Sequence, residues 1–383
     1  MSRSPRLTAR RVTRCATRAR TRPVVVLVAT LGLVLTACSG SGEDEGTAPG
    51  SPAGSSPSSR SGSPAEPSAA ATDSSTSSED DSADSAADRL PTAASDVSLP
   101  AMMRRDYDGR GLRLGRVLAS TGDYVRHAAS YRSDGLRISG IMNIPRGRGP
   151  FPVLVLLHGY IDPAYYVTGQ GLMREQDYLA REGYAVLHID YRNHAGSDAD
   201  PAAERRLRLG YTADTINAVL AVKRSRIARL DGDRIGLLGR SMGGGVTYNA
   251  LVTRPGLVKA AVVFAPVSSR TADNFNRWIR DDRSDLAAEI TSRHGTPRGN
   301  PRFWREVSPR PYFDRVTEPL LIHHGTSDDS CPIRWTRASY GALKAAGKDA
   351  KLYVYDGEEH AFGPQWPLSM RRTVRFLDRA MAS

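Results

Sequence analysis

Residues 234–245 read Arg-Ile-Gly-Leu-Leu-Gly-Arg-Ser-Met-Gly-Gly-Gly, and this stretch decides the fold. Arg234–Leu238 predicts a buried strand, and the residues that follow Ser241 predict a helix over about 242–253. A Gly-x-Ser-x-Gly turn between a strand and a helix lifts the serine above the sheet edge, because side chains in place of the two glycines would collide with the neighbouring strand and helix. The helix N-terminus also favours negative charge beside the hydroxyl. We therefore predict that Ser241 is a nucleophile.

Strands and helices alternate on both sides of this stretch. An antiparallel hairpin is expected at 124–131 and 136–144, before the alternation begins. The expected strands are 151–157, 184–189, 234–238, 259–264, 320–322 and 350–355. The expected helices are 172–182, 211–229, 242–253, 334–346 and 367–381. This order predicts an α/β domain over residues 101–383, with a mostly parallel central sheet and helices on both faces.

Residues 267–316 interrupt the alternation. The segment carries four large aromatic residues among many charges, namely Phe275, Trp278, Phe303 and Trp304. An excursion of this length inside a compact domain usually has structure of its own and often has a function. Two interpretations stay open. The segment is a cap over the site, or it is an ordinary surface insertion held in place by its aromatic side chains.

A serine hydroxyl needs an adjacent base to act as a nucleophile. Asp328 follows the expected strand 320–322, and His360 follows the expected strand 350–355. Both loops leave the carboxyl ends of strands, where open α/β sheets place their ligands. The sequence therefore predicts Asp328 as the acid that orients His360, and His360 as the base.

Backbone amides are expected to complete the site. The strand 151–157 ends in His158-Gly159-Tyr160, so the Tyr160 amide is available to bind a substrate carbonyl oxygen. The Met242 amide is the predicted second donor. His158 is interpreted as a structural residue behind this oxyanion hole rather than as a catalyst. His323 and His324 lack metal-ligand spacing to other residues, so we predict no metal and no cofactor.

Five segments together resemble the α/β-hydrolase fold, and more narrowly the catalytic domain of the prolyl oligopeptidase (S9) family and its dienelactone-hydrolase-like relatives. These segments are residues 157–160, 190–197, 239–244, 324–329 and 357–362. The resemblance covers about residues 130–382. It implies hydrolysis through an acyl-enzyme. In that family the first aspartate of His-Gly-Thr-x-Asp-Asp is the acid, which supports Asp328 over Asp329.

Two departures bear on the substrate. Prolyl oligopeptidases carry a β-propeller that screens peptides, whereas a polar tract and a hairpin precede the catalytic domain here. Dienelactone hydrolases have a cysteine where Ser241 stands. We therefore expect an esterase or short-peptide hydrolase that cleaves small acyl esters better than long peptides. The alternatives are an S9-type serine peptidase proper, and a catalytically inactive binding lipoprotein on a hydrolase scaffold.

The N-terminus predicts a targeting segment. Residues 1–37 contain eight arginines and no acidic residue, and they end in an apolar stretch at 23–37. The sequence Leu35-Thr36-Ala37-Cys38 resembles a bacterial lipobox, so we expect a signal peptide at 1–37, a lipid on Cys38 and an exported protein anchored to the outer face of the cell membrane. An uncleaved anchor or a buried helix is the alternative. Processing would leave Cys331 unpaired, so we expect no intramolecular disulfide.

The remaining segments differ in charge. Residues 38–100 are rich in Ser, Ala, Pro, Gly and Asp and carry a net charge of −9, which predicts a disordered tether. Residues 101–383 carry a net charge of +13. These charges are spread along the chain without a nucleic-acid-binding motif, so we expect no nucleic-acid partner. Weak attraction to anionic lipid headgroups is compatible with this charge.

Overall fold

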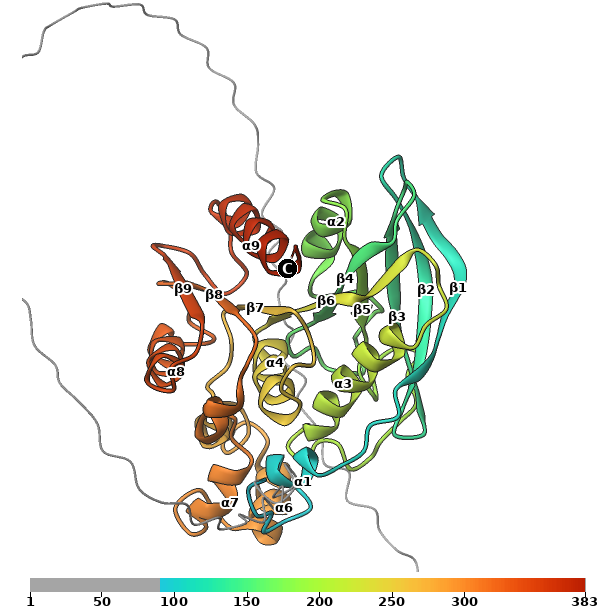
Figure 1. The fold of residues 1–383 in the computed structure, drawn as a ribbon. Coiled ribbons are helices and arrows are strands. Elements are labelled where there is room, and N and C mark those ends of the chain that lie inside the picture. The colour runs from blue at the N-terminus through green and yellow to red at the C-terminus, as the bar shows by residue number, and fades with distance from the viewer. Residues whose placement is uncertain (1–89, 383) are drawn as a thin grey trace, which may run out of the picture. The chain divides into compact units, whose positions relative to one another are not determined.

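The computed structural model describes residues 90–382, which form a nine-stranded sheet flanked by helices (Figure 1). The strands are β1 (Arg110–Ser120), β2 (Tyr124–Ser133), β3 (Leu136–Pro145), β4 (Phe151–Leu157), β5 (Ala185–Ile189), β6 (Leu230–Arg240), β7 (Ala260–Phe264), β8 (Leu320–Gly325) and β9 (Ala350–Tyr355). The helices are α1 (Leu99–Met103), α2 (Met173–Arg181), α3 (Leu209–Lys223), α4 (Met242–Thr253), α5 (Thr271–Trp278), α6 (Ser284–His294), α7 (Pro301–Glu306), the 3-10 helix η1 (Arg310–Arg315), α8 (Ile333–Ala345) and α9 (Trp366–Met381).

The strand order is β1-β2-β3-β5-β4-β6-β7-β8-β9. Pairing is antiparallel from β1 through β3 to β5 and parallel from β5 to β9. The parallel strands therefore end at one edge of the sheet, and the loops that carry the predicted site residues leave from that edge. The prediction of a mostly parallel α/β sheet is confirmed.

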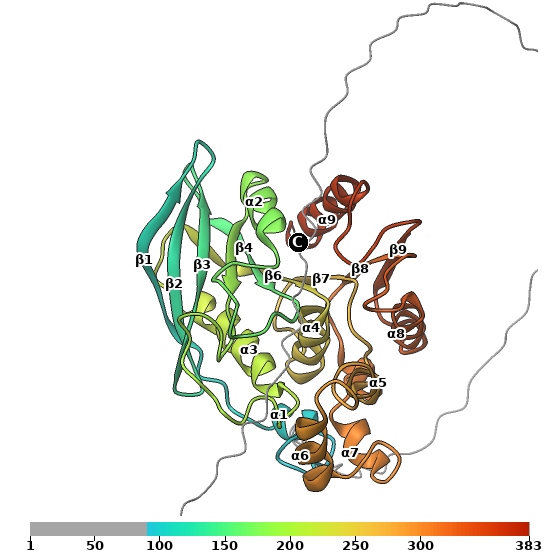
Figure 2. The same ribbon diagram turned by 180° about the vertical axis from the view of Figure 1, so that it is seen from behind.

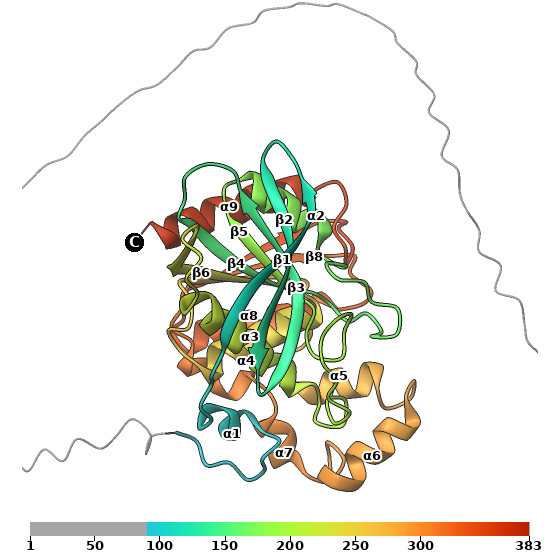
Figure 3. The ribbon, with the colours of Figure 1, turned by 90° about the vertical axis from the view of Figure 1, so that its right-hand side faces the viewer.

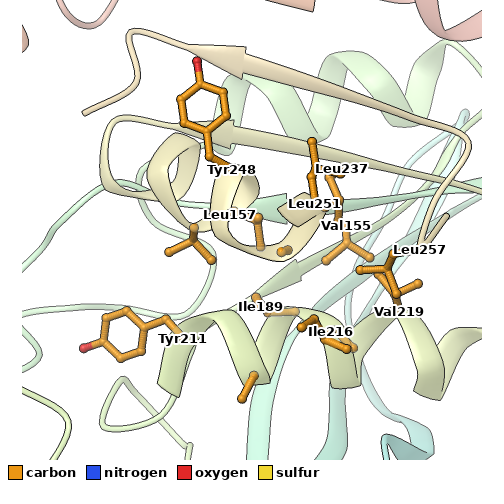
Figure 4. Packing of buried hydrophobic residues seen from close by; sticks show 14 of the residues in the cluster. Val155, Leu157, Ile189, Tyr211, Ile216, Val219, Leu237, Tyr248, Leu251 and Leu257 are labelled. Carbon is orange, nitrogen blue, oxygen red and sulfur yellow. The ribbon is translucent and has the colours of Figure 1, made fainter. Parts of the chain in front are cut away.

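The core lies in two layers, one on each face of the sheet. Alternate residues of β4 separate between them: Val153 and Val155 join the layer beneath α3 and α4, while Leu154 and Leu156 join the layer beneath α2 and α9. Both layers are almost fully buried, as expected for a strand that is apolar on both sides. Figure 2 shows the helices on the two faces, and Figure 4 shows the packing between α3, α4 and the sheet. This packing holds the parallel strand ends in fixed positions.

Strand β1 was missing from the sequence-based prediction, which had only the β2–β3 hairpin. β1 is an edge strand, most of its residues are exposed, and its pairing with β2 is interrupted by three shifts in register. Arginines at 110, 113 and 116 also obscure any alternation of apolar and polar residues. A two-residue period was therefore not visible in the sequence.

The predicted tether boundary at residue 100 is wrong. Residues 90–100 lie on the folded domain, where Val97, Ser98 and Leu99 are buried. The Ala94 amide donates a hydrogen bond to Glu306 of α7 over 3.0 Å, and Ser98 caps α1. The apolar group Val97–Met103 supplies this anchoring, although the residues before it are polar. The signal peptide, Cys38 and the tether up to residue 89 lie outside the described residues.

Helices α5 to α7 and η1 form the segment that interrupts the strand–helix alternation. They follow β7 and precede β8, and they lie with α1 at one end of the domain (Figure 3). Helix α7 starts at a proline and is capped by Asn300, whose side chain accepts a hydrogen bond from the Phe303 amide. We call residues 267–316 the cap. None of the helices within residues 90–382 is long and apolar enough to cross a membrane.

Candidate active site

Ser241 stands between β6 and α4 in a strained backbone conformation. Its φ is 57° and its ψ is −119°, a region that non-glycine residues rarely adopt. A Cβ added to Gly243 would lie 1.9 Å from the Leu157 carbonyl oxygen, and one added to Gly239 would lie 2.3 Å from the Gly243 carbonyl oxygen. The two glycines therefore let the turn pass against β4, as expected from the motif, and the turn lifts Ser241 to the sheet edge.

Asp328 and His360 meet beside this turn, on the loops after β8 and β9. His360 Nδ1 lies 2.8 Å from Asp328 Oδ2. The Asp328 carboxylate is buried, whereas the His360 side chain keeps 25% of its surface exposed. Asp329 is exposed and makes no contact with His360 among the described residues. The geometry thus pairs Asp328 rather than Asp329 with the imidazole.

Four donors, among them the Ser330 amide at 3.0 Å from Oδ1, hold Asp328 in its charged form. Burial alone would raise the pKa of Asp328, but hydrogen bonds from His324, His360 and the Cys331 amide outweigh burial and hold that pKa well below its usual range. The Cys331 amide lies 2.8 Å from Asp328 Oδ1, and His324 Nε2 lies 3.3 Å from Oδ2. Asp328 is therefore a carboxylate at neutral pH. The hydrogen bond from His324 was not predicted, because the only hint in the sequence is that residues 324 and 328 are close along the chain.

Ser241 and His360 line the same cavity but are not joined by a hydrogen bond within the described residues. The Ser241 hydroxyl instead faces the Cys331 thiol, with Oγ and Sγ 4.0 Å apart. Burial raises the pKa of the Cys331 thiol to about 12, and the nearby Asp328 charge adds to this, so the thiol stays protonated. In enzymes of this kind the nucleophile–base hydrogen bond often tightens only when substrate binds.

The predicted oxyanion donors lie on either side of Ser241. A Cβ added to Gly159 would come within 3.2 Å of the Ser241 Cβ, so the Gly159-Tyr160 backbone passes directly over the nucleophile. Within residues 90–382 neither the Tyr160 amide nor the Met242 amide donates a hydrogen bond to the protein. Both amides are therefore available to a ligand oxygen, as an oxyanion hole requires.

His158 is fully buried behind this loop. Its Nδ1 lies 2.7 Å from the Gly159 carbonyl oxygen, and its ring stacks on Tyr166 at 4.5 Å between centroids. Burial lowers the pKa of His158 to about 3, so the ring is neutral. These contacts fit the structural role expected for it. The described residues contain no group of three or more His, Cys, Asp or Glu side chains placed to hold a metal ion.

A cavity of about 520 Å³ opens beside Ser241, Tyr160, Met242 and His360. The face of α4 forms one wall and the cap forms another. The cap residues that line it include Thr271, Asn274, Phe275, Trp278, Ile279, Arg283 and Val307. Residues 267–316 therefore cover the site, and the interpretation as a plain surface insertion is set aside.

Two of the four cap aromatics, Phe275 and Trp278, line the cavity. Trp304 packs behind Phe275 with ring centroids 4.7 Å apart, and Phe303 stacks on His294 at 4.2 Å. Phe303 and His294 belong to the core of the cap, where α7 packs against α5.

An arginine of the cap binds the loop that carries Asp328. Arg277 Nε donates to the Ser330 carbonyl oxygen over 2.7 Å, and its Nη2 donates to the Asp329 carbonyl oxygen. The neighbouring Trp278 packs edge-to-face on Trp335 of α8. Helix α5 is thereby fixed to the acid loop. This contact could not be predicted from the sequence, because the two residues lie 53 positions apart.

A second ionic contact links the cap, through Glu204 and Arg208, to the loop that carries Tyr160. Glu204 accepts two hydrogen bonds from Arg208, each of 2.9 Å, and one of 2.8 Å from Arg283 of the cap. The Arg208 guanidinium lies over the Tyr160 ring, 4.3 Å from its centroid. Arg208 and its neighbour Leu207 both have positive φ angles, of 58° and 52°. This strained turn aims the Arg208 side chain at the site.

The sequence profile of the prolyl oligopeptidase family, Peptidase S9, matches residues 170–383. This is more than half of the chain, and it includes Ser241, Asp328 and His360. The chain belongs to the prolyl oligopeptidase family. It is a serine hydrolase with the α/β-hydrolase fold, as the sequence predicted.

Relatives of the family differ in how much of them this chain spans. This chain is 30% identical over 235 residues to the uncharacterized peptidase YuxL of Bacillus subtilis. The match covers 59% of this chain and 34% of YuxL. The chain is 24% identical over 270 residues to the uncharacterized peptidase YtmA of the same species, covering 70% of this chain and 97% of YtmA. The chain thus spans about a third of one relative and nearly all of the other.

Solved structures share the fold. An acetyl xylan esterase from Paenibacillus sp. R4 superposes with a TM-score of 0.54 at 20% identity, covering 73% of this chain and 92% of the esterase. An acylaminoacyl peptidase in complex with Z-Gly-Gly-Phe-chloromethyl ketone superposes with a TM-score of 0.52 at 25% identity, covering 68% of this chain and 41% of that one. The same fold therefore carries both ester and peptide chemistry among its neighbours.

Proposed function

We propose that this member of the prolyl oligopeptidase family hydrolyses acyl esters or amides with Ser241 as nucleophile. The observation that carries the proposal is the 2.8 Å contact between His360 Nδ1 and Asp328 Oδ2 beside the strained Ser241 turn. This contact leaves Nε2 of His360 as the ring nitrogen for proton transfer. Asp328 orients the ring and stabilises the imidazolium.

The reaction follows from these positions. Ser241 Oγ attacks the substrate carbonyl carbon while His360 takes the hydroxyl proton. The amides of Tyr160 and Met242 bind the oxyanion that forms. His360 then donates the proton to the leaving group, which departs and leaves an acyl-enzyme. Water attacks the acyl-enzyme with His360 again as base, and Ser241 is regenerated.

The cavity bears on the choice of substrate. Its walls are mainly apolar, with Met242 and Val246 from α4 facing Phe275 and Ile279 from the cap. Such walls suit acyl groups of small to moderate size, and each peptide amide buried against them without a partner would cost about 1–3 kcal/mol. We therefore favour acyl esters over extended peptides. Peptidase activity is the second candidate, motivated by the peptidases among its relatives.

A turnover panel tests this proposal. Short and medium acyl esters and aminoacyl amides are assayed with the wild-type protein and with Ser241→Ala. We expect the highest kcat/KM on an ester and a loss of at least about 10⁴-fold in Ser241→Ala. Higher kcat/KM on a peptide amide would favour the peptidase. Turnover that survives in folded Ser241→Ala would contradict the mechanism, and no turnover by the wild type would favour an inactive binding protein.

We also propose export and anchoring through Cys38. The support is sequence alone: the arginine-rich residues 1–22, the apolar residues 23–37 and the lipobox-like Leu35–Cys38. Expression of the full chain with Cys38→Ala should release the protein from the membrane fraction or leave it unprocessed. Mass spectrometry of the mature N-terminus checks this, and an unmodified N-terminus at another residue would refute it.

A further inference from the structure

Asn249 lies on α4, on the helix face that lines the cavity beside Ser241. Ser241, Met242, Gly245, Val246 and Asn249 all line the cavity, and their spacing of three and four residues places them along one stripe. Asn249 stands eight positions after Ser241. At a rise of 1.5 Å per residue, Asn249 lies about 12 Å from the nucleophile along the helix.

The Asn249 carboxamide has no hydrogen-bond partner among the described residues. Its Oδ1 is buried and unpaired. Two other polar side chains of the cavity wall, Asn274 and Thr271, are hydrogen-bonded to the protein. Asn274 bonds to both backbone groups of Ser268, and the Thr271 hydroxyl donates to the Val307 carbonyl oxygen over 2.7 Å.

The Asn249 side chain is half-buried, and a covered carboxamide oxygen without a partner is unfavourable, so an apolar side chain of the same shape would serve the packing of α4 better. An asparagine at this place is explained if something that enters the cavity pairs with it. The neighbouring wall residues Val246, Leu209 and Val307 are apolar and offer no alternative partner. The carboxamide provides donors and an acceptor, so it matches an amide or a hydroxyl group.

We propose that Asn249 is a specificity-determining residue that binds an amide or hydroxyl group on the acyl part of the substrate, about 12 Å from the scissile carbonyl. The stretch between the two groups is apolar, to match Val246 and Met242. A plain alkyl chain of that length would leave Asn249 unpaired. This inference rests on the proposed hydrolase function and narrows it to functionalised acyl groups.

The test compares matched substrates. p-Nitrophenyl esters of alkanoic acids with about eight to twelve carbons, whose extended chains span the roughly 12 Å along α4, are paired with esters of equal length that end in a carboxamide. The wild-type protein should prefer one carboxamide ester over its alkyl partner. Asn249→Leu should lower that preference about 10- to 100-fold in kcat/KM, because it removes the pairing and keeps the shape.

Asn276→Leu is the control, since Asn276 is exposed on α5 and does not line the cavity. It should keep the wild-type preference. The inference is overturned if the wild type does not discriminate at any chain length, or if folded Asn249→Leu keeps the preference, while turnover through Ser241 persists. If no ester is turned over by the wild type, the proposed function fails and this inference fails with it.

Discussion

The loops of the proposed triad and the cap are held in place in different ways. Ser241, Asp328 and His360 follow β6, β8 and β9, whose parallel pairing is fixed by backbone hydrogen bonds. The cap is fixed to the site by side chains, chiefly Arg277 on the acid loop and Arg283 on Glu204. The comparison indicates that the sheet positions the loops of the proposed triad, whereas long-range side-chain contacts position the cap that lines the cavity.

The largest effect should come from the acid of the proposed triad. Asp328→Asn removes the charge that faces His360 at 2.8 Å, and it should lower kcat by about 10⁴-fold. Asp329→Asn is the matched control, since its side chain is exposed, and kcat should change less than about 5-fold. Steady-state kinetics on a common ester compares the two. Equal losses, or a larger loss in Asp329→Asn, would contradict the assignment of Asp328 as the acid of the triad.

Acidification should destabilise the sheet region before the carboxylates titrate. Burial lowers the pKa of His158 and of His323 to about 3 and lowers the pKa of His188 well below its usual value, so all three rings are neutral in the folded state and bind protons on unfolding. Because the folded pKa lies below the unfolded value of about 6.5, stability is lost as pH falls below 6.5. The three rings together should lower the unfolding free energy by about 3 kcal/mol between pH 6.5 and 5.5.

Urea unfolding at the two pH values measures this loss. His323→Gln, which cannot titrate, should show about two thirds of it. The loss should be carried by the sheet and not by the cap, because all three histidines lie in or next to sheet strands: His158 directly follows β4, His188 belongs to β5 and His323 belongs to β8. A pH dependence unchanged in His323→Gln would mean that its ring is charged in the folded protein.

A smaller effect is expected where the cap meets the acid loop. Arg277→Ala removes the donors to the Asp329 and Ser330 carbonyl oxygens and should lower kcat/KM about 10- to 100-fold. Arg277→Lys should recover part of this. Arg280→Ala, on the exposed end of the same segment, is the control and should be neutral. If Arg277→Ala retains full kcat/KM on short and long acyl esters, the cap does not position the loop.

The sequence was sufficient for the strand ends and their loops. Gly239 and Gly243 mark the turn through local sterics, and His360 follows a short apolar strand, so pattern and order predict their places. The same holds for the two core layers, since β4 is apolar at every position. These features depend on neighbours along the chain.

The parts that could not be predicted depend on distant segments. Glu204, Arg208 and Arg283 come together only when the cap folds back on the turn before α3. Strand β1 was not predicted because its exposed residues show no two-residue period. Asn249 was not predicted as a site residue because nothing in the helix pattern around it distinguishes it from its neighbours. Charged and polar side chains of this kind do not reveal their partners from spacing alone.

Labelling with a fluorophosphonate shows directly whether Ser241 is an activated nucleophile. The intact full chain is treated with the probe, digested and mapped by mass spectrometry. We expect one modified residue, Ser241, with labelling absent in Ser241→Ala and slowed at least about 100-fold in Asp328→Asn. A folded protein that stays unlabelled, or a label on another residue, would contradict it.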